Sequence, residues 1–174
     1  AIIDSNIDRF KLLRSRQAIE YTVNVLENKW FEYFTNHLST SKVVLEINDL
    51  KILFIHGDLK DPLWGPMSTT EMSMEKYEEY DYVISGHTHI PKLFERFSNN
   101  NSPKAKRGKI KTVFINPGSV GQPRNHNTSA QYAVLDTASE TVHFNAVPYN
   151  IENEILLYNG EIDEFYWKRL RLGV

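Results

Sequence analysis

Three of the six histidines have a spacing that could place them together at a metal site. His56 directly follows an apolar run, and His87 and His89 follow a second apolar run, Tyr82–Ser85. Open α/β sheets bind ligands at the carboxyl ends of their strands, so the three imidazoles would meet at one edge if these strands are neighbours. Imidazole binds Zn, Mn, Fe and Ni in proteins. The pattern therefore predicts that His56, His87 and His89 are metal ligands, the alternative being three ordinary histidines at strand ends.

The sequence Asn-Pro-Gly-Ser at 116–119 follows a third strand-like run. A tight turn here, with Gly118 exposing backbone N–H groups, could hold an anion or support metal-bound histidines. Arg124 follows closely, and its guanidinium could bind a phosphate through two hydrogen bonds, so it is the candidate substrate-binding residue. The alternatives are an ordinary turn and a solvated arginine. We expect five loop residues to support the site: Gly57, Gly86, Asn116, Gly118 and Ser119.

The other histidines lack this context, and we expect His37, His126 and His143 to be structural or solvated. The chain has no cysteine, which excludes disulfides, thiolate metal sites and thiol catalysis. Its 174 residues suit one domain over residues 1–174, and its net charge of −2 is too balanced for a protein that mainly grips nucleic acid. No nucleophile-elbow, P-loop or dinucleotide-binding glycine pattern occurs.

The elements that would position these residues follow from the spacing of apolar side chains. Helices are predicted over 10–26, 28–38, 152–158 and 163–172, and weakly over 71–80. Strands are predicted over 42–47, 50–56, 82–85, 92–97, 110–115, 131–136 and 141–147. We expect 50–56 to be buried on both faces, 57–70 to be a long loop and 98–108 to be a polar hairpin tip. Strands with helices at both ends predict an α/β domain with a mixed sheet.

Three motifs, in their order along the chain, resemble the C-terminal half of calcineurin-like metallophosphoesterases. They are Ile55-His56-Gly57, Gly86-His87-Thr88-His89 and Asn116-Pro117-Gly118-Ser119. The likeness is closest to the compact, mainly prokaryotic branch of that family and spans nearly the whole chain. The ending is similar too, with Val147-Pro148-Tyr149-Asn150 before the last helices.

The resemblance implies the C-terminal part of an α/β–β/α sandwich with a mixed sheet and flanking helices. It also implies a hydrolase that uses two divalent metal ions and an activated hydroxide on phosphomonoesters or phosphodiesters. By the family pattern, His56 and His87 would bind one ion and His89 the other. Manganese is the expected metal, with Fe, Zn and Ni as alternatives. The partner would be a phosphorylated small molecule or a phosphodiester.

Of the earlier motifs of this family, Asp-x-His and Gly-Asn-His-Asp are absent from these 174 residues. The one match to Gly-Asp-x-x-Asp, at 57–61, belongs to the later His-Gly motif and its proline-bearing loop, so it is not a substitute. In the family the earlier motifs carry the bridging carboxylate, an asparagine ligand and the histidine that supports the leaving group. We therefore expect this chain to be the C-terminal portion of a longer phosphoesterase, with the acid and base residues outside it. Activity of this chain alone is left open.

Two other functions fit parts of the pattern: a non-catalytic protein-binding scaffold on the same fold, and a mononuclear zinc enzyme with three histidine ligands. The basic stretch 104–109 is interpreted as a solvated tip, with a nucleic-acid contact as the alternative. It has no interleaved aromatic residue to support stacking, so a nucleic-acid partner is not indicated. No basic-plus-apolar leader opens the sequence, and no apolar run approaches the ~20 residues that span a bilayer. We expect no membrane partner and a cytoplasmic location.

Overall fold

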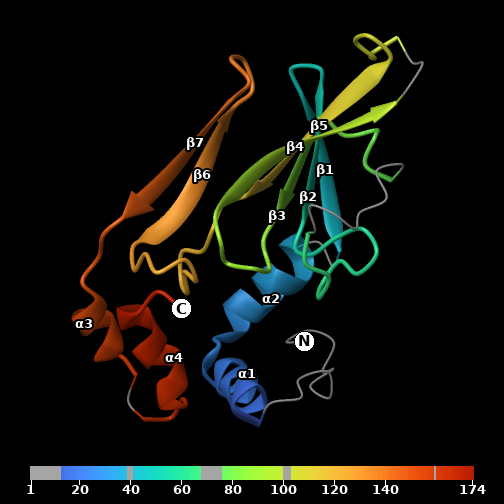
Figure 1. The fold of residues 1–174 in the computed structure, drawn as a ribbon. Coiled ribbons are helices and arrows are strands. Elements are labelled where there is room, and N and C mark those ends of the chain that lie inside the picture. The colour runs from blue at the N-terminus through green and yellow to red at the C-terminus, as the bar shows by residue number, and fades with distance from the viewer. Residues whose placement is uncertain (1–12, 39–40, 68–75, 100–102, 159) are drawn as a thin grey trace. The chain divides into compact units, whose positions relative to one another are not determined.

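The computed structural model describes residues 13–38, 41–67, 76–99, 103–158 and 160–174. These residues form two compact units (Figure 1). The helical unit contains the described residues up to 38 together with 150–172, and the sheet unit contains 41–149 with 173–174. That the chain acts as one domain stays a prediction. None of the described helices has the length and apolar character needed to cross a bilayer.

The helical unit joins the first helices of the chain to the last ones. Asn150 and Asp163 cap two of the later helices by accepting hydrogen bonds from first-turn N–H groups. The Arg14 guanidinium lies 3.9 Å from the centre of the Phe165 ring, a cation–π contact between the first helix and the last α-helix. The elements are α1 (Leu13–Val25), α2 (Asn28–His37), α3 (Ile151–Ile155), α4 (Glu164–Lys168) and a 3₁₀ turn, Arg169–Arg171.

The sheet unit contains a five-stranded mixed sheet and a separate hairpin. The sheet has the order β1-β2-β3-β5-β4, in which β2, β3 and β5 are parallel and the edge strands β1 and β4 are antiparallel to their neighbours. The second sheet is the antiparallel pair β6–β7. This arrangement confirms the predicted mixed α/β fold. The strands are β1 (Lys42–Ile47), β2 (Leu50–Ile55), β3 (Tyr82–Ser85), β4 (Lys92–Asn99), β5 (Lys109–Asn116), β6 (Ala130–Asp136) and β7 (Thr141–Val147).

The core lies on both faces of the five-stranded sheet. On one face Phe114, 1% exposed, stacks on Phe94 with ring centres 4.8 Å apart and meets the Tyr77 ring edge-on. On the other face Ile52 and its neighbours pack against Leu135 and other apolar residues of the β6–β7 hairpin. Apolar packing on both faces explains why the central strands are short continuous apolar runs.

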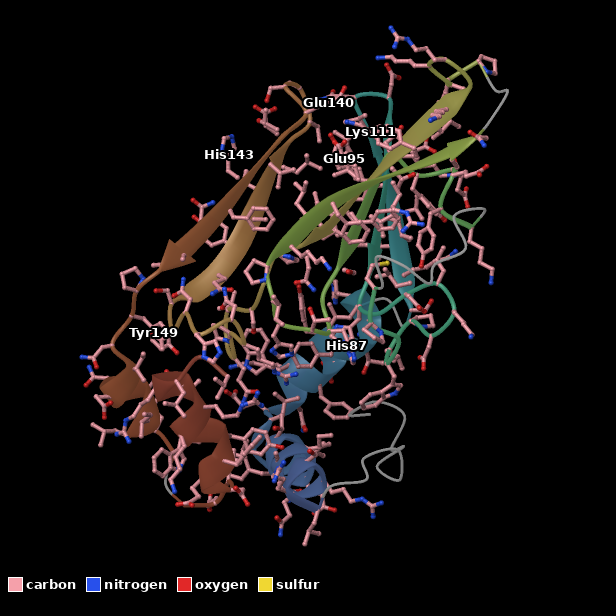
Figure 2. All side chains as sticks on the ribbon, viewed as in Figure 1. His87, Glu95, Lys111, Glu140, His143 and Tyr149 are labelled. Carbon is pink, nitrogen blue, oxygen red and sulfur yellow. The ribbon has the colours of Figure 1, made fainter. Side chains whose placement is uncertain are left out.

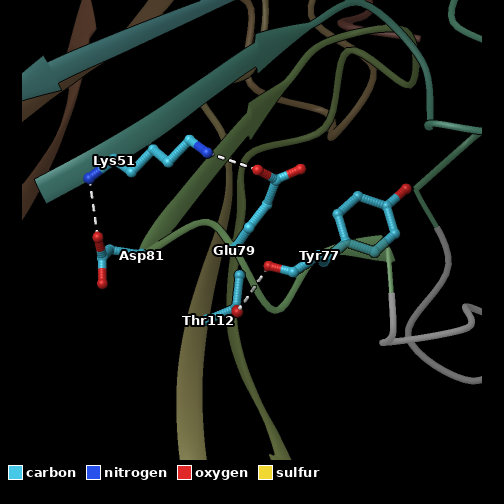
Figure 3. A network of polar contacts seen from close by, with 5 residues as sticks. All are labelled: Lys51, Tyr77, Glu79, Asp81 and Thr112. Carbon is cyan, nitrogen blue, oxygen red and sulfur yellow. Dashed lines mark hydrogen bonds and ion pairs between the residues drawn. The ribbon is translucent and has the colours of Figure 1, made fainter. Parts of the chain in front are cut away.

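The turn before β3 is held from β5. The hydroxyl of Thr112, which is fully buried, donates to the carbonyl oxygens of Tyr77 (3.3 Å) and Tyr80 (3.0 Å), the first of these bonds being drawn in Figure 3. Both tyrosines are 3% exposed and belong to the core. Residue 76 is 3₁₀-helical and 77–79 form a compact turn, so the weak helix predicted over 71–80 does not continue as an α-helix through this described part, while 71–75 lie outside the described residues.

Other differences from the sequence predictions concern burial and boundaries. Phe54 is 36% exposed, because it lies on the same face as Ile52 but outside the apolar cluster that covers Ile52. The prediction that this strand is buried on both faces is wrong at that residue. Strand β4 ends at Asn99 and strand β5 begins at Lys109, so the hairpin tip is shorter than predicted. Residues 100–102 of this tip lie outside the described residues.

Candidate metal centre

The pairing of β2 with β3 brings two of the predicted ligands together. These strands are parallel with Ile55 opposite Ser85, so His56 and His87 leave adjacent strand ends. Their ring centres lie 5.4 Å apart with the planes at 88°. The N–H of Gly86 donates to the His56 carbonyl oxygen at 3.0 Å, and a Cβ on Gly86 would lie 3.4 Å from His56 Nδ1. The two loops therefore lie close together, although a Cβ at this distance would make an ordinary contact and glycine is not required here.

His87 and His89 both adopt left-handed backbone conformations, with φ of 64° and 61°. Such values are uncommon for residues other than glycine, cost free energy and concentrate at functional sites. Between them, the N–H of Thr88 donates to the Gly86 carbonyl oxygen at 2.8 Å, which tightens the turn. The chain therefore bends sharply at this strand end, as expected for two ligands separated by one residue.

His89 is oriented by a backbone carbonyl. Its Nδ1 lies 2.9 Å from the carbonyl oxygen of Gln122. A carbonyl can only accept, so Nδ1 carries the proton and Nε2 of the neutral ring keeps its lone pair. Metal-binding histidines are commonly fixed in this way by a partner on the second nitrogen.

Arg124 lies beside His89, as a substrate-binding residue would need to. Its backbone N–H donates to the His89 carbonyl oxygen at 3.2 Å. Its Nε is buried and has no acceptor within the described part of the chain. A buried cationic donor without a partner is costly, and a bound anion would relieve that cost.

Asn116 joins the histidine loop to the turn after β5. The residue is 8% exposed. Its Nδ2 donates to the Gly86 carbonyl oxygen (2.6 Å) and to Thr88 Oγ1 (3.0 Å), and its Oδ1 accepts from the Gly118 N–H at 3.0 Å. One amide side chain therefore ties together the loops at the ends of β3 and β5.

The turn at Gly118 requires glycine and is supported from β6. Its φ is +89°, and a Cβ there would lie 2.6 Å from Oε1 of the buried Gln131. The Gln131 N–H donates to the Ser119 carbonyl oxygen, and Ser119 Oγ accepts from the N–H of Gln122, whose carbonyl orients His89. Gln122 and Gln131 were not identified from the sequence, since a glutamine next to a turn carries no distinctive signal.

The loop after His56 is folded tightly on itself. Gly57 donates to the Pro62 carbonyl oxygen at 2.7 Å, and a Cβ on Gly57 would lie 2.5 Å from the Asp61 carbonyl oxygen. This fold places Trp64 edge-on to His87, with ring centres 6.5 Å apart. Trp64 is a further neighbour of the site that the sequence did not reveal, because only the tertiary fold brings it to His87.

The electrostatics favour neutral imidazole at His56. Partial burial of the ring, followed by repulsion from His87, lowers the pKa of His56 below its ordinary value. Neutral imidazole is the form that binds a metal ion. The described residues nevertheless contain no group of three or more His, Asp or Glu side chains close enough to hold one ion. The structure thus brings His56 and His87 together, and the role of all three histidines as metal ligands stays a prediction.

Comparison with known proteins decides the family. A family model described as a calcineurin-like phosphoesterase superfamily domain matches residues 3–140. The chain belongs to this superfamily. Proteins of this family are generally metal-dependent.

Individual relatives agree with this assignment. The chain is 28% identical over 165 residues to an uncharacterized protein of Methanocaldococcus jannaschii, covering 90% of this chain and 65% of that protein. It is 35% identical over 77 residues to a probable metallophosphoesterase of the same organism, covering 42% of this chain and 39% of that protein. The chain therefore spans less than two thirds of the length of either relative.

Two solved structures share the fold. A metallophosphoesterase from Sphaerobacter thermophilus superimposes with a TM-score of 0.72 at 21% identity, covering 97% of this chain and 72% of that one. A hypothetical protein from Pyrococcus horikoshii OT3 gives a TM-score of 0.71 at 21% identity, with 97% and 64% coverage. At this identity the likeness establishes the fold alone.

Proposed function

We propose that the protein is a metal-dependent phosphoesterase that hydrolyses phosphomonoesters or phosphodiesters, with this chain supplying the C-terminal part of the site. The observation that carries the proposal is the placement of His56 and His87 at adjacent strand ends, in contact and with His89 following, in a chain of the phosphoesterase superfamily. Two divalent ions would occupy the site, and manganese is the expected metal. A bound metal pair supplies a hydroxide nucleophile and neutralises phosphate charge.

The residues of this chain would hold the metal ions and orient the substrate. In our proposal His56 and His87 bind one ion and His89 the other through Nε2. The Gln122 carbonyl keeps the His89 proton on Nδ1. Arg124, next to His89, binds the phosphate oxygens of the substrate. Its buried Nε, which has no partner among the described residues, supports this role.

The remaining ligands would come from outside these residues. Three imidazoles cannot complete two metal sites, and none of the family's earlier motifs, Asp-x-His, Gly-Asp-x-x-Asp or Gly-Asn-His-Asp, precedes His56 in this sequence. We therefore propose that this chain works within a longer polypeptide, whose other part contributes the bridging carboxylate and the acid and base residues. Reading the coding sequence upstream of Ala1 tests this directly, and an upstream stop codon followed by the start of this chain would contradict it.

The activity itself is tested with the complete polypeptide, p-nitrophenyl phosphate and bis-(p-nitrophenyl) phosphate, with and without MnCl₂. We expect manganese-dependent release of nitrophenol. Substituting His87→Ala or His89→Ala should reduce it on the order of 100-fold or more, since several kcal/mol of charge stabilisation are lost. The control is His143→Ala, an exposed histidine on β7, which should retain the activity. Activity in both site variants close to that of the unsubstituted protein would contradict the proposal.

A non-catalytic scaffold on the same fold is the second candidate. It is favoured by one observation, that the described residues contain no group of three potential ligands. A scaffold predicts that the chain captures a protein partner equally well after His87→Ala and His89→Ala. Metal-dependent hydrolysis that these substitutions abolish would reject it.

A further inference from the structure

A second candidate binding surface lies at the end of the sheet opposite the histidines. Strand β5 begins at Lys109 and ends at Asn116, so the two ends of this strand are separated by roughly 20 Å. Figure 2 shows Lys111 and Glu140 at one end of the sheet unit and His87 at the other. An open groove of about 950 Å³ lies at the Lys111 end. No residue of the candidate metal centre lines it.

The groove is rich in lysine. Six lysines line it, and four carboxylates share the lining. The ammonium of Lys51 is paired with Glu79, and its backbone N–H donates to Asp81 at 2.7 Å, so two of those carboxylates are already engaged (Figure 3). The lysines come from four separate segments of the sheet unit and are Lys51, Lys76, Lys104, Lys106, Lys109 and Lys111.

Most of these ammonium groups are available to a ligand. No carboxylate lies within ion-pair distance of Lys76, Lys104, Lys106 or Lys109 in the described part of the chain. Lys111 does contact Glu95 at 3.3 Å, but both side chains are 45% exposed, and ion pairs of this kind contribute little. A phosphate could therefore displace Glu95 from Lys111 at small cost.

An exposed aromatic ring lies among the lysines. Phe97, 57% exposed, lines the groove and is the direct cross-strand partner of Lys111 in the β4–β5 register. Side chains directly opposite in an antiparallel pair lie on the same face, about 5 Å apart at Cβ. The hairpin thus interleaves an aromatic ring with lysines that lie more than ten positions away in the sequence.

We propose that this groove binds single-stranded nucleic acid, with phosphates on the lysines and a base stacked on Phe97. Lys109 and Lys111 are two residues apart on one strand and lie ~7 Å apart on one face, a separation comparable to that of neighbouring phosphates in an extended strand. Lysine-lined grooves with exposed aromatic rings are the general means of binding single strands without sequence preference. This inference goes beyond the proposed phosphoesterase function and does not depend on it.

The test is fluorescence anisotropy with a labelled oligothymidine of about 12 nucleotides, in EDTA at about 50 mM salt, so that no metal-dependent reaction occurs. We expect saturable binding whose log Kd rises with log salt at a slope of about 2 to 3, as for three or four phosphate contacts. Phe97→Ala should weaken binding by about 5- to 100-fold, and Phe97→Trp should restore it. The double substitution Lys106→Glu with Lys109→Glu should weaken binding at least as much.

Two control variants distinguish the groove from other binding modes. Arg107→Glu makes the same kind of charge change in the same tip, but Arg107 does not line the groove, so it should have a clearly smaller effect than Lys109→Glu. His87→Ala should leave the affinity unchanged if the strand lies in the groove. Any of four results would overturn the proposal. They are absence of binding, a loss of affinity in Arg107→Glu equal to that in Lys109→Glu, no effect of Phe97→Ala on affinity, and a loss of affinity in His87→Ala.

Discussion

Asn116→Asp is the substitution that best tests the architecture of the histidine site. It changes one N–H₂ group to oxygen and leaves the shape of the side chain unchanged. The Gly86 carbonyl oxygen, now 2.6 Å from a donor, would face a carboxylate oxygen instead. Thr88 can rotate its hydroxyl and donate to the new oxygen, and the Gly118 N–H still donates to Oδ1. The loss therefore falls on the contact with Gly86.

The expected magnitude follows from burial. The Gly86 carbonyl oxygen keeps the Thr88 N–H as a donor at 2.8 Å but loses the hydrogen bond from Asn116, which costs about 0.5–1.5 kcal/mol, and the two facing oxygen atoms repel each other. At 8% exposure the ionised carboxylate is also desolvated, which raises the pKa of the introduced group above the unfolded value of about 3.9. Each unit of that rise costs about 1.4 kcal/mol once the group is ionised. We expect a total loss of about 2–4 kcal/mol in the free energy of unfolding at pH 8.

The loss must also depend on pH. Because the folded pKa of the introduced carboxyl is raised, the folded state binds more protons than the unfolded state between the two values. The deficit is therefore complete above the folded pKa and shrinks as pH falls toward 3.9, where the protonated group can again donate to Gly86. We expect a deficit of about 1 kcal/mol or less at pH 4.

Urea unfolding of the chain and its variant, followed by circular dichroism at pH 4 and pH 8, measures both quantities. Asn145→Asp is the matched control, since Asn145 is partly exposed on β7 and its side chain donates one long, solvent-exposed hydrogen bond of 3.2 Å to the His143 carbonyl oxygen. It should change the free energy of unfolding by about 0.5 kcal/mol or less at both pH values. If Asn116→Asp matched this control at pH 8, or if its deficit were the same at both pH values, the reasoning would be refuted.

Three further predictions concern single groups. Partial burial lowers the pKa of His56 in the metal-free chain, so an NMR titration should find a pKa below about 6.5. The stability contributed by neutral His56 should be complete above about pH 6.5 and should decline as the pH falls through the lowered pKa. A pKa at or above about 6.5 would contradict this. Gly118→Ala should lower the free energy of unfolding by about 2–3 kcal/mol, because the φ of +89° is strained for alanine and its Cβ would make close contacts. Gly121→Ala, where a Cβ would meet no atom within 4 Å, should lower it by about 0.5 kcal/mol or less in the same thermal unfolding experiment. Equal losses would show that the turn at Gly118 is not tight. Thr112→Val should cost about 1–2 kcal/mol in urea unfolding, because the buried Tyr80 carbonyl loses its hydroxyl donor, while the Tyr77 carbonyl keeps the Tyr80 N–H. The exposed Thr141→Val should be nearly neutral, and a neutral Thr112→Val would show that the hydroxyl does not hold the turn.

The sequence predicted the strands well because short runs of apolar and β-branched residues mark strands even where the structure leaves them exposed, as in β1. β1, β3 and β7 begin and end at the predicted residues, and Ile52, Leu53 and Ile55 are buried as expected. The position of the candidate site followed from the same pattern, since polar residues directly after apolar runs must lie at strand ends. Boundaries at the chain ends were less accurate: the last predicted helix is a short α-helix, α4, followed by a 3₁₀ turn.

What the sequence could not provide is the orientation of the side chains within the loops. The left-handed backbone of His87 and His89 and the edge-on contact of Trp64 depend on tertiary contacts. The stretch 104–109 shows the same limit. It has no aromatic residue of its own, yet strand pairing places Phe97 opposite Lys111, so interleaving that is absent along the chain is present across the hairpin.

The two candidate surfaces share one rigid element, and this has a physical consequence for their coupling. β5 is hydrogen-bonded on both sides, to β3 and β4, and five consecutive residues at its C-terminal end are buried. The groove uses the exposed lysines at the start of this strand, and the histidine site uses Asn116 at its end. A strand fixed on both edges has no second arrangement available to it within the sheet, and coupling between sites requires an element with two states. The groove and the metal centre should therefore bind their ligands independently.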